Sequence, residues 1–253
     1  MFGIIKTRIK QGYRTTKYPK AAPLLPDGFK GLPKIDCPKC NAGCRQCIES
    51  CSVKAIDGIH TEPFIDLGKC IFCGACERIC PAKAISFTSE HSLAARDRKD
   101  LLLSRAAAPR KAAPLEKDRL RVFHRSIRLR QVSAGGCNAC EADISVLNTL
   151  AFDLSRFGIQ FVASPRHADG LVITGPVTKN MALALKKTFD ATPAPKVVIA
   201  VGACAISGGM FAEQKETHQG ASGLLPVDLF IPGCPPHPYT ILDGLLRLLG
   251  KVT

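Results

Sequence analysis

The stretch CIFCGACERICP, residues 70–81, decides how the first half of the chain folds. Its cysteines follow the C-x2-C-x2-C-x3-C-P spacing of bacterial ferredoxins, which hold cubane iron–sulfur clusters. Cys70, Cys73 and Cys76 can bind three corners of one cluster from a single loop, while Cys80 can reach a second cluster. Structural zinc fits less well, because its sites usually combine two close ligand pairs across a longer insert. The spacing therefore predicts [4Fe–4S] clusters.

A second copy of this unit precedes the first at an offset of 29 residues. CIESCSVKAID (47–57) aligns with CERICPAKAIS (76–86), so each copy joins a cysteine cluster to a short Ala-Ile strand. A core as small as these two units can form is marginal without metal or disulfides. We therefore expect residues 37–90 to form an α+β ferredoxin-like two-cluster domain.

The N-terminal copy, which contains Cys37 to Cys51, departs from the ferredoxin spacing at one ligand. Cys44, Cys47 and Cys51 keep the spacing, but Asn41 stands where the first cysteine is expected. Either Cys40 or Cys37 must supply that corner, and Cys40 needs the smaller adjustment. The crossed ligation of two-cluster ferredoxins then predicts two sites. One consists of Cys40 (or Cys37), Cys44, Cys47 and Cys80, and the other of Cys51, Cys70, Cys73 and Cys76.

Residues 127–253 alternate apolar strand-like runs with helical stretches. This alternation is typical of a parallel α/β sheet with helices on its faces, here expected to be flavodoxin-like. The expected strands are 127–132, 159–163, 170–174, 196–201 and 227–231, and the expected helices are 141–156, 178–190 and 238–249.

Four further cysteines follow three of these strands. They are Cys137, Cys140, Cys204 and Cys234. The carboxyl ends of parallel strands share one edge of the sheet, so we expect these four thiols to converge from three loops. Adjacent glycines would let the backbone approach a bulky inorganic group; they are Gly135, Gly136, Gly202 and Gly233. Four cysteines suit zinc or a cubane cluster equally by count.

The 253 residues carry a formal net charge of +14, and its location is informative. Residues 1–36 hold 8 Lys/Arg against 2 Asp/Glu, and residues 91–130 hold 12 against 4, whereas both cysteine-rich regions are formally neutral. We expect a basic N-terminal arm (1–36) and a basic linker (91–126). Nucleic acid is not an expected partner, because the excess charge lies outside the folded regions. No G-x-G-x-x-G follows a strand, so bound NAD or FAD is not expected either.

The N-terminal arm can form a short amphipathic helix. Phe2, Ile5 and Ile9 recur at helical spacing among basic residues, so residues 1–20 could lie on an anionic membrane surface. A solvated basic tail is the alternative. No apolar run reaches the roughly 18 residues of a membrane-spanning helix. Clustered cysteines without a secretory leader indicate a reducing, cytosolic compartment.

Four separated motifs carry a resemblance to a known family. GGCNACEADI, SPRHADGLVITGPVT, VGACAISGG and VDLFIPGCPP occur in order between residues 125 and 250. Together they resemble the small subunit of membrane-bound [NiFe]-hydrogenases of the formate hydrogenlyase type and its relative in complex I. The N-terminal part, with MFGIIKTRIKQGYRTTKYP and both cysteine clusters, resembles the two-cluster ferredoxin subunit of the same complexes, here fused through the linker. Ser52 stands where that pattern usually has proline.

The resemblance implies an iron–sulfur oxidoreductase subunit without a catalytic residue of its own. Cys137, Cys140, Cys204 and Cys234 would hold the third of three [4Fe–4S] clusters, nearest a [NiFe]-hydrogenase-type large subunit. The spaced pair Cys137 and Cys140 resembles the hydrogenase side, because the complex I subunit has adjacent cysteines there. The alternative is a complex I-like NADH/quinone oxidoreductase without nickel. Either way the resemblance implies membrane-arm partner subunits and a peripheral position on the cytoplasmic face of the inner membrane.

Overall fold

The 29-residue repeat of the sequence reappears in the backbone. Helices α2 (Gln46–Glu49) and α3 (Ala75–Ile79) begin at equivalent positions of the two copies, as do strands β2 (Ile56–Asp57) and β4 (Ile85–Phe87). Lys54 and Lys83, which are also equivalent, share a left-handed backbone with φ of 49°. The two copies therefore fold alike, and α2 and α3 lie in contact.

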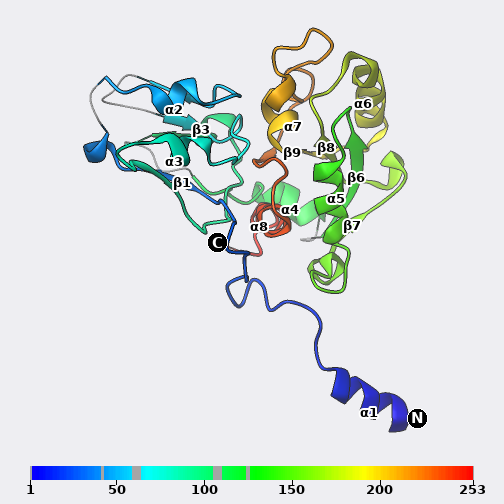
Figure 1. Ribbon diagram of the computed structural model, residues 1–253. Helices are drawn as coiled ribbons and strands as arrows, with labels where there is room; N and C mark the ends of the chain where they lie inside the picture. The colour runs from blue at the N-terminus through cyan, green and yellow to red at the C-terminus, as the bar shows by residue number, and fades with distance from the viewer. Residues whose placement is uncertain (1, 41–42, 59–63, 105–109, 124–125, 253) are drawn as a thin grey trace.

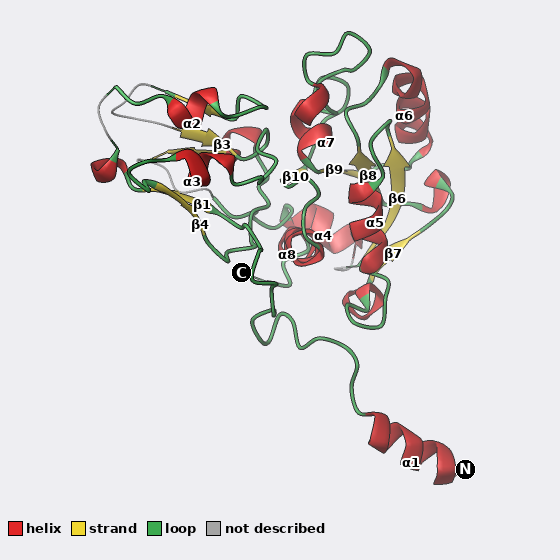
Figure 2. Cartoon of the chain, viewed as in Figure 1, coloured by secondary structure: helices red, strands yellow, loops and turns green. Residues whose placement is uncertain are grey.

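The computed structural model describes residues 2–40, 43–58, 64–104, 110–123 and 126–252. In Figure 1 the two cysteine-cluster copies form one lobe and the larger sheet forms a second lobe beside it. Figure 2 shows how little regular structure the first lobe has outside its short helices and strands. Its remaining elements are β1 (Pro33–Ile35), η1 (Cys37–Lys39) and β3 (Phe64–Asp66). Strand β1 pairs antiparallel with β4, and β2 with β3.

The segment expected to be a linker is more ordered than its composition indicates. After η2 (Arg98–Leu101), strand β5 (Leu102–Ser104) extends the β2–β3 sheet. Ala95 bridges Phe230 of the second lobe, and α4 (Lys117–Phe123) follows nearer that lobe. The physical reason is the apolar fraction of the segment, since Leu93, Leu101, Leu103, Leu115 and Phe123 are buried.

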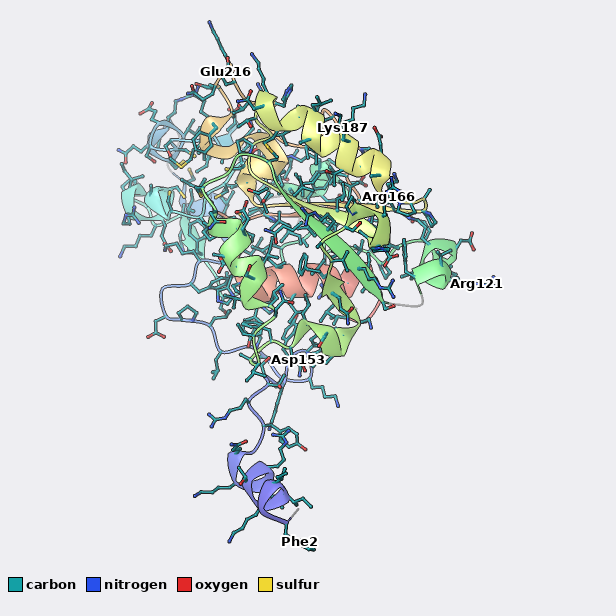
Figure 3. All side chains as sticks on the ribbon, turned by 90° about the vertical axis from the view of Figure 1, so that its right-hand side faces the viewer. Phe2, Arg121, Asp153, Arg166, Lys187 and Glu216 are labelled. Atoms are coloured by element: carbon teal, nitrogen blue, oxygen red, sulfur yellow. The ribbon has the colours of Figure 1, made fainter. Side chains whose placement is uncertain are left out.

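The N-terminal arm divides into a projecting helix and a docked strand. Helix α1 (Phe2–Gln11) contains no buried residue and points away from both lobes (Figure 3). Tyr18, in contrast, is 7% exposed and donates a hydrogen bond to Asp243 at 2.7 Å. The arm is therefore anchored to the body from about this tyrosine onward, as β1 also shows. Within the described residues, no helix has both the length and the apolar character needed to cross a membrane.

The second lobe contains the predicted parallel α/β sheet. Five parallel strands run in the order β10-β9-β8-β6-β7. Their bounds are β6 (Ile127–Ser133), β7 (Ile159–Phe161), β8 (Gly170–Thr174), β9 (Val197–Val201) and β10 (Leu229–Ile231). Numbered within this sheet, the order is 2-1-3-4-5, which places the topological switch point between β6 and β8.

Helices cover both faces of the sheet. On one face α5 (Ala139–Val146) and α8 (Pro238–Leu248) bury Leu129, Val172 and Ile199. On the other, α6 (Lys179–Ala191) packs Leu185 against Leu171 and Ile173. Strands β8 and β9 are buried along their whole length, as expected for a sheet covered on both sides.

Two helices differ from the sequence-based expectation. Helix α5 ends at Val146 rather than near residue 156, because Thr149 donates its hydroxyl to the Val146 carbonyl at 2.8 Å and the chain turns. The turn sends Leu147 into the core, and η3 (Leu154–Phe157) follows. Helix α7 (Ala203–Ser207) was not expected, because five residues are too few to show helical periodicity. The short turns η4 (Pro165–His167) and η5 (Gly209–Phe211) complete the lobe.

Candidate metal centres

Twelve cysteine side chains are described, all present as thiols rather than disulfides. They gather into three groups of four, two in the first lobe and one at the carboxyl edge of the second. The three groups match the three sets that the sequence predicts.

The first group lines a small cavity in the first lobe. Its thiols are Cys40, Cys44, Cys47 and Cys80. Ile35, Ile56 and Ile85 close the walls with apolar side chains. Cys40 lines this cavity with the other three thiols, while the side chain of Cys37, the alternative ligand, lies outside the described part of the chain.

The second group lines a small cavity on the other side of the pseudo-dyad. Its thiols are Cys51, Cys70, Cys73 and Cys76. The walls include Ile65, Gly74 and Phe87, so this cavity is dry as well. In each group three cysteines come from one copy and the fourth from the other, as the crossed pattern predicts.

Backbone amides point at the thiols in both copies of the repeat. The amide of Ala55 donates to the Cys51 sulfur at 3.2 Å, and the equivalent amide of Ala84 donates to the Cys80 sulfur at 3.2 Å. The amide of Phe72 reaches the Cys70 sulfur at 3.3 Å. Such hydrogen bonds stabilise charge on sulfur and are one means by which a protein sets the potential of a bound cluster.

The third group forms where three loops leave the sheet. Cys137 and Cys140 follow β6, Cys204 follows β9 and Cys234 follows β10. Burial raises the pKa of Cys140, the charge of Glu141 raises it further, and the thiols of Cys204, Cys234 and Cys137 add smaller contributions. Cys140 thus interacts with each of the other three thiols, which indicates that the four lie near one another where β6, β9 and β10 end.

Only one of the four predicted glycines lies against a thiol. A Cβ added to Gly202 would lie 2.6 Å from the Cys140 sulfur. A Cβ added to any of the other three glycines would meet other loop residues instead of a thiol. The nearest atoms belong to Thr178 for Gly135, Gly175 for Gly136 and Pro236 for Gly233, so these glycines allow the loops to pack closely. Gly209, which sequence reasoning missed, lies against Cys204, whose sulfur would be 2.9 Å from a Cβ added to this glycine. Its only sequence signal is its place in the motif VGACAISGG.

Burial makes the thiols poor acids in the absence of a metal. It raises the pKa of Cys70 to about 12 and that of Cys204 to about 11, with smaller contributions from neighbouring thiols. These two thiols would therefore stay protonated alone, and a bound metal group must displace their protons. Four thiolates together in a dry cavity demand several positive charges as compensation.

The spacing of the thiols distinguishes a cluster from a single ion. Zinc needs four ligand atoms at about 2.0–2.3 Å from one centre. Across the described ranges, no three His, Cys, Asp or Glu side chains converge closely enough to hold one metal ion. Four thiols around a cavity, without a common centre, fit a group that offers a separate metal atom to each. The donor set therefore fits iron–sulfur clusters better than zinc.

A buried carboxylate lies beside the third group at the switch point. Glu141, in the first turn of α5, accepts hydrogen bonds of 2.6 Å from both Ser133 and Thr174. These hydroxyls end β6 and β8, so the carboxylate ties the Cys140 helix to both central strands.

Comparison with known proteins agrees with this arrangement. The model of the NADH ubiquinone oxidoreductase 20 kDa subunit family matches residues 137–248, and a 4Fe-4S binding domain model matches residues 63–86. A probable membrane-bound hydrogenase subunit, mbhJ of Pyrococcus furiosus, is 44% identical over 131 residues, covering 52% of this chain and 74% of that protein. Formate hydrogenlyase subunit 7 of Escherichia coli is 41% identical over 138 residues, which is 54% of each chain. An NADH-quinone oxidoreductase subunit of Citrifermentans bemidjiense is 46% identical over 117 residues, covering 46% of this chain and 68% of that protein.

The fold, the cysteine groups and these similarities define an iron–sulfur electron-transfer subunit of the oxidoreductase class. The chain belongs to the family of the 20 kDa subunit of NADH ubiquinone oxidoreductase, and it carries a 4Fe-4S binding domain in the same polypeptide. The predicted combination of these two parts is confirmed.

Proposed function

We propose that the chain holds three [4Fe–4S] clusters and relays electrons between a donor and the active site of a large partner subunit. The first cluster would be held by Cys40, Cys44, Cys47 and Cys80, and the second by Cys51, Cys70, Cys73 and Cys76. The third would be held by Cys137, Cys140, Cys204 and Cys234. When bound, such clusters supply reversible one-electron transfer.

The domain organisation follows from the same features. We propose a ferredoxin-like domain over residues 37–90, supported by the duplicated helix–strand units and their crossed cysteine groups. The second domain, residues 127–253, would be flavodoxin-like, which its 2-1-3-4-5 strand order supports. The arm (1–36) and the linker (91–126) would then join and brace these two domains.

The order of the three sites along the relay is supported by contacts between the lobes. The Ser207 hydroxyl, three residues beyond Cys204, donates to the Gly68 carbonyl at 2.9 Å, just before Cys70. Ile71 and Phe72 line the same cavity as Cys234, with a volume of about 400 Å³. The second group therefore adjoins the third, which makes the first group the outermost member of the series.

The observation that carries the proposal is the open side of the third group. Cys137 and Cys234 are exposed while Cys140 and Cys204 are half-buried, so the site faces outward on one side. Met210 and Phe211 beside it expose 63% and 41% of their surface. Exposed apolar side chains around a redox site are typical of a surface that a partner covers.

We propose that this partner is a [NiFe]-hydrogenase-type large subunit. The spaced pair Cys137 and Cys140 supports this choice, together with the hydrogenase names of two relatives. The other candidate is a complex I-like large subunit that lacks nickel, which the similarity to the NADH-quinone oxidoreductase subunit supports. Membrane-arm subunits would complete either assembly.

Helix α1 supports a peripheral position on a membrane. Its apolar side chains are exposed, from Ile5 at 53% to Phe2 at 88%, and Lys6, Arg8 and Lys10 lie among them. Such a helix can bury its apolar side at the boundary of an anionic bilayer. The site would be the cytoplasmic face of the inner membrane.

The decisive experiment uses the intact complex, purified without oxygen. Iron and sulfide should each approach about twelve per chain, with three EPR-active centres on reduction. Nickel content and hydrogen evolution then separate the two kinds of large subunit. A colourless protein with stoichiometric zinc would overturn the proposal.

A further inference from the structure

Lys30 of the N-terminal arm lies directly over the second cysteine group. Its Cε would be 2.4 Å from a Cβ added to Gly74, so its side chain fills the space that this glycine leaves open. Gly74 stands between Cys73 and Cys76 and lines the second cavity. The arm therefore places an ammonium group against the outer wall of this cavity.

Only a thin layer separates that ammonium from the cavity. Lys30 Nζ lies 5.2 Å from the ring centroid of Phe87, and the same ring forms part of the cavity wall. The wall at Gly74 is bare backbone. Because the side chain of Lys30 is 30% exposed, water screens its charge only in part.

A carboxylate of fixed position balances the lysine. Glu77 Oε2 accepts from Lys30 Nζ at 2.6 Å, and Glu77 Oε1 accepts from the Phe87 amide at 3.1 Å. Glu77 follows Cys76 directly, and its own amide donates to the Cys76 sulfur. Two opposite charges are thus held rigidly beside one cysteine group.

We infer that Lys30 and Glu77 form an electrostatic pair that sets the reduction potential of the group bound by Cys51, Cys70, Cys73 and Cys76. This inference rests on the proposed function, because it requires a cluster at those cysteines. Reduction adds a negative charge inside the cavity. Lys30 stabilises that charge and Glu77 opposes it, so the two residues act in opposite directions on one potential.

The test is a potentiometric EPR titration of the full, cluster-loaded chain. The relevant signal is the one that Cys73→Ser removes. Lys30→Met should shift its midpoint to lower potential, and Glu77→Gln should shift it to higher potential. The midpoint potential of the double variant should lie closer to the wild-type value than that of at least one of the single variants. Lys30→Arg keeps the charge and should keep the potential.

Matched variants separate electrostatics from structural damage. Lys111→Met also removes one cation from an ion pair, with Glu90 at 3.0 Å, but it is Lys30 and not Lys111 that packs against Gly74 of the second cavity. It should leave the midpoint unchanged. Iron content, measured on every variant, identifies any variant that fails to bind its clusters. If Lys30→Met fails in this way, the near-isosteric Glu77→Gln still predicts a shift of the midpoint to higher potential.

The outcomes are distinguishable from those of the proposed function. If Lys30→Met and Glu77→Gln both give a normal signal with the wild-type midpoint, the inferred role of the Lys30–Glu77 pair is overturned. Shifts in the same direction for both variants also overturn it, since they would report loosened packing. A wild-type chain without any iron–sulfur signal overturns the proposed function itself, and this inference with it.

Discussion

Gly202 faces the thiol of Cys140 so closely that a Cβ in its place would lie 2.6 Å from the sulfur. Its φ of +91° is also strained for any residue with a side chain. We therefore expect Gly202→Ala to displace Cys140 and prevent assembly at the third group. The purified chain should lose about one third of its iron and retain the signals of the first two groups.

Gly223 provides the control for this substitution. A Cβ there would meet nothing within 4 Å, and its φ lies outside the left-handed region. Gly223→Ala should keep full iron content. If Gly202→Ala also keeps its full iron content and EPR spectrum, the close approach has no bearing on cluster assembly.

The crossed arrangement of the first two groups predicts a pattern of paired losses. Cys51→Ser and Cys73→Ser should remove the same EPR signal, because both thiols line one cavity. Cys80→Ser and Cys44→Ser should remove the other signal. Combining Cys51→Ser with Cys73→Ser should cost no more iron than either alone, whereas Cys51→Ser with Cys80→Ser should cost about twice as much. The assignment would be contradicted if Cys80→Ser removed the same EPR signal as Cys76→Ser, its neighbour in the sequence.

Much of the site could be predicted from the sequence because ligand spacing is a local property. The run from Cys70 to Cys80 fixes a loop geometry, and its 29-residue repeat fixes the partner copy. The strand periodicity located all five strands of the large sheet within a few residues. Since parallel strands end at one edge, the convergence of Cys137, Cys204 and Cys234 followed from topology alone.

The features that sequence reasoning missed depend on contacts between distant segments. Nothing in the local pattern around Lys30 indicates Glu77, which is 47 residues away. The basic composition of the linker concealed its buried leucines and strand β5, which forms only because β3 offers it an edge. Tyr18 likewise gave no signal, because its partner Asp243 lies 225 residues further along.

The contact between Tyr18 and Asp243 should anchor the arm. Asp243 is 1% exposed and also accepts from Arg247 Nε at 2.7 Å, so each of its two carboxylate oxygens has a donor in the interior. Tyr18→Phe leaves one carboxylate oxygen without its donor, and we expect the free energy of unfolding to fall by about 1–3 kcal/mol. Denaturant unfolding monitored by circular dichroism measures this loss. Tyr13→Phe, at a residue that is 91% exposed, should change nothing; equal stability of the two variants would exclude an anchoring role.

His91 should make the same region sensitive to acid. Burial lowers its pKa from the ordinary 6.5, against an opposing effect of Asp243 and Glu90. Above pH 6.5 the ring is neutral in both folded and unfolded chains, so it has no effect on stability. As the pH falls through 6.5, the unfolded chain takes up a proton that the folded chain resists, and stability decreases.

The measurement for His91 compares unfolding midpoints at pH 7.5 and pH 5.5. His91→Gln should reduce the difference between the two midpoints relative to the wild type. His218→Gln removes an exposed histidine and serves as the matched control. An unchanged difference in His91→Gln would show that other groups carry the acid sensitivity.

Helix α1 should bind anionic bilayers independently of the cysteine groups. The truncation that tests this must end near Gly12, because removing residues as far as Tyr18 would also break the contact with Asp243. A chain lacking residues 2–12 should keep its iron and lose sedimentation with vesicles that contain phosphatidylglycerol.

The double variant Ile5→Asp, Ile9→Asp should have the same effect as the truncation, since these side chains are 53% and 76% exposed and would enter the bilayer. Binding of the wild type to neutral phosphatidylcholine vesicles should be weaker, because Lys6, Arg8 and Lys10 then find no anionic partner. Equal sedimentation of the full and truncated chains would mean that α1 is a solvated tail.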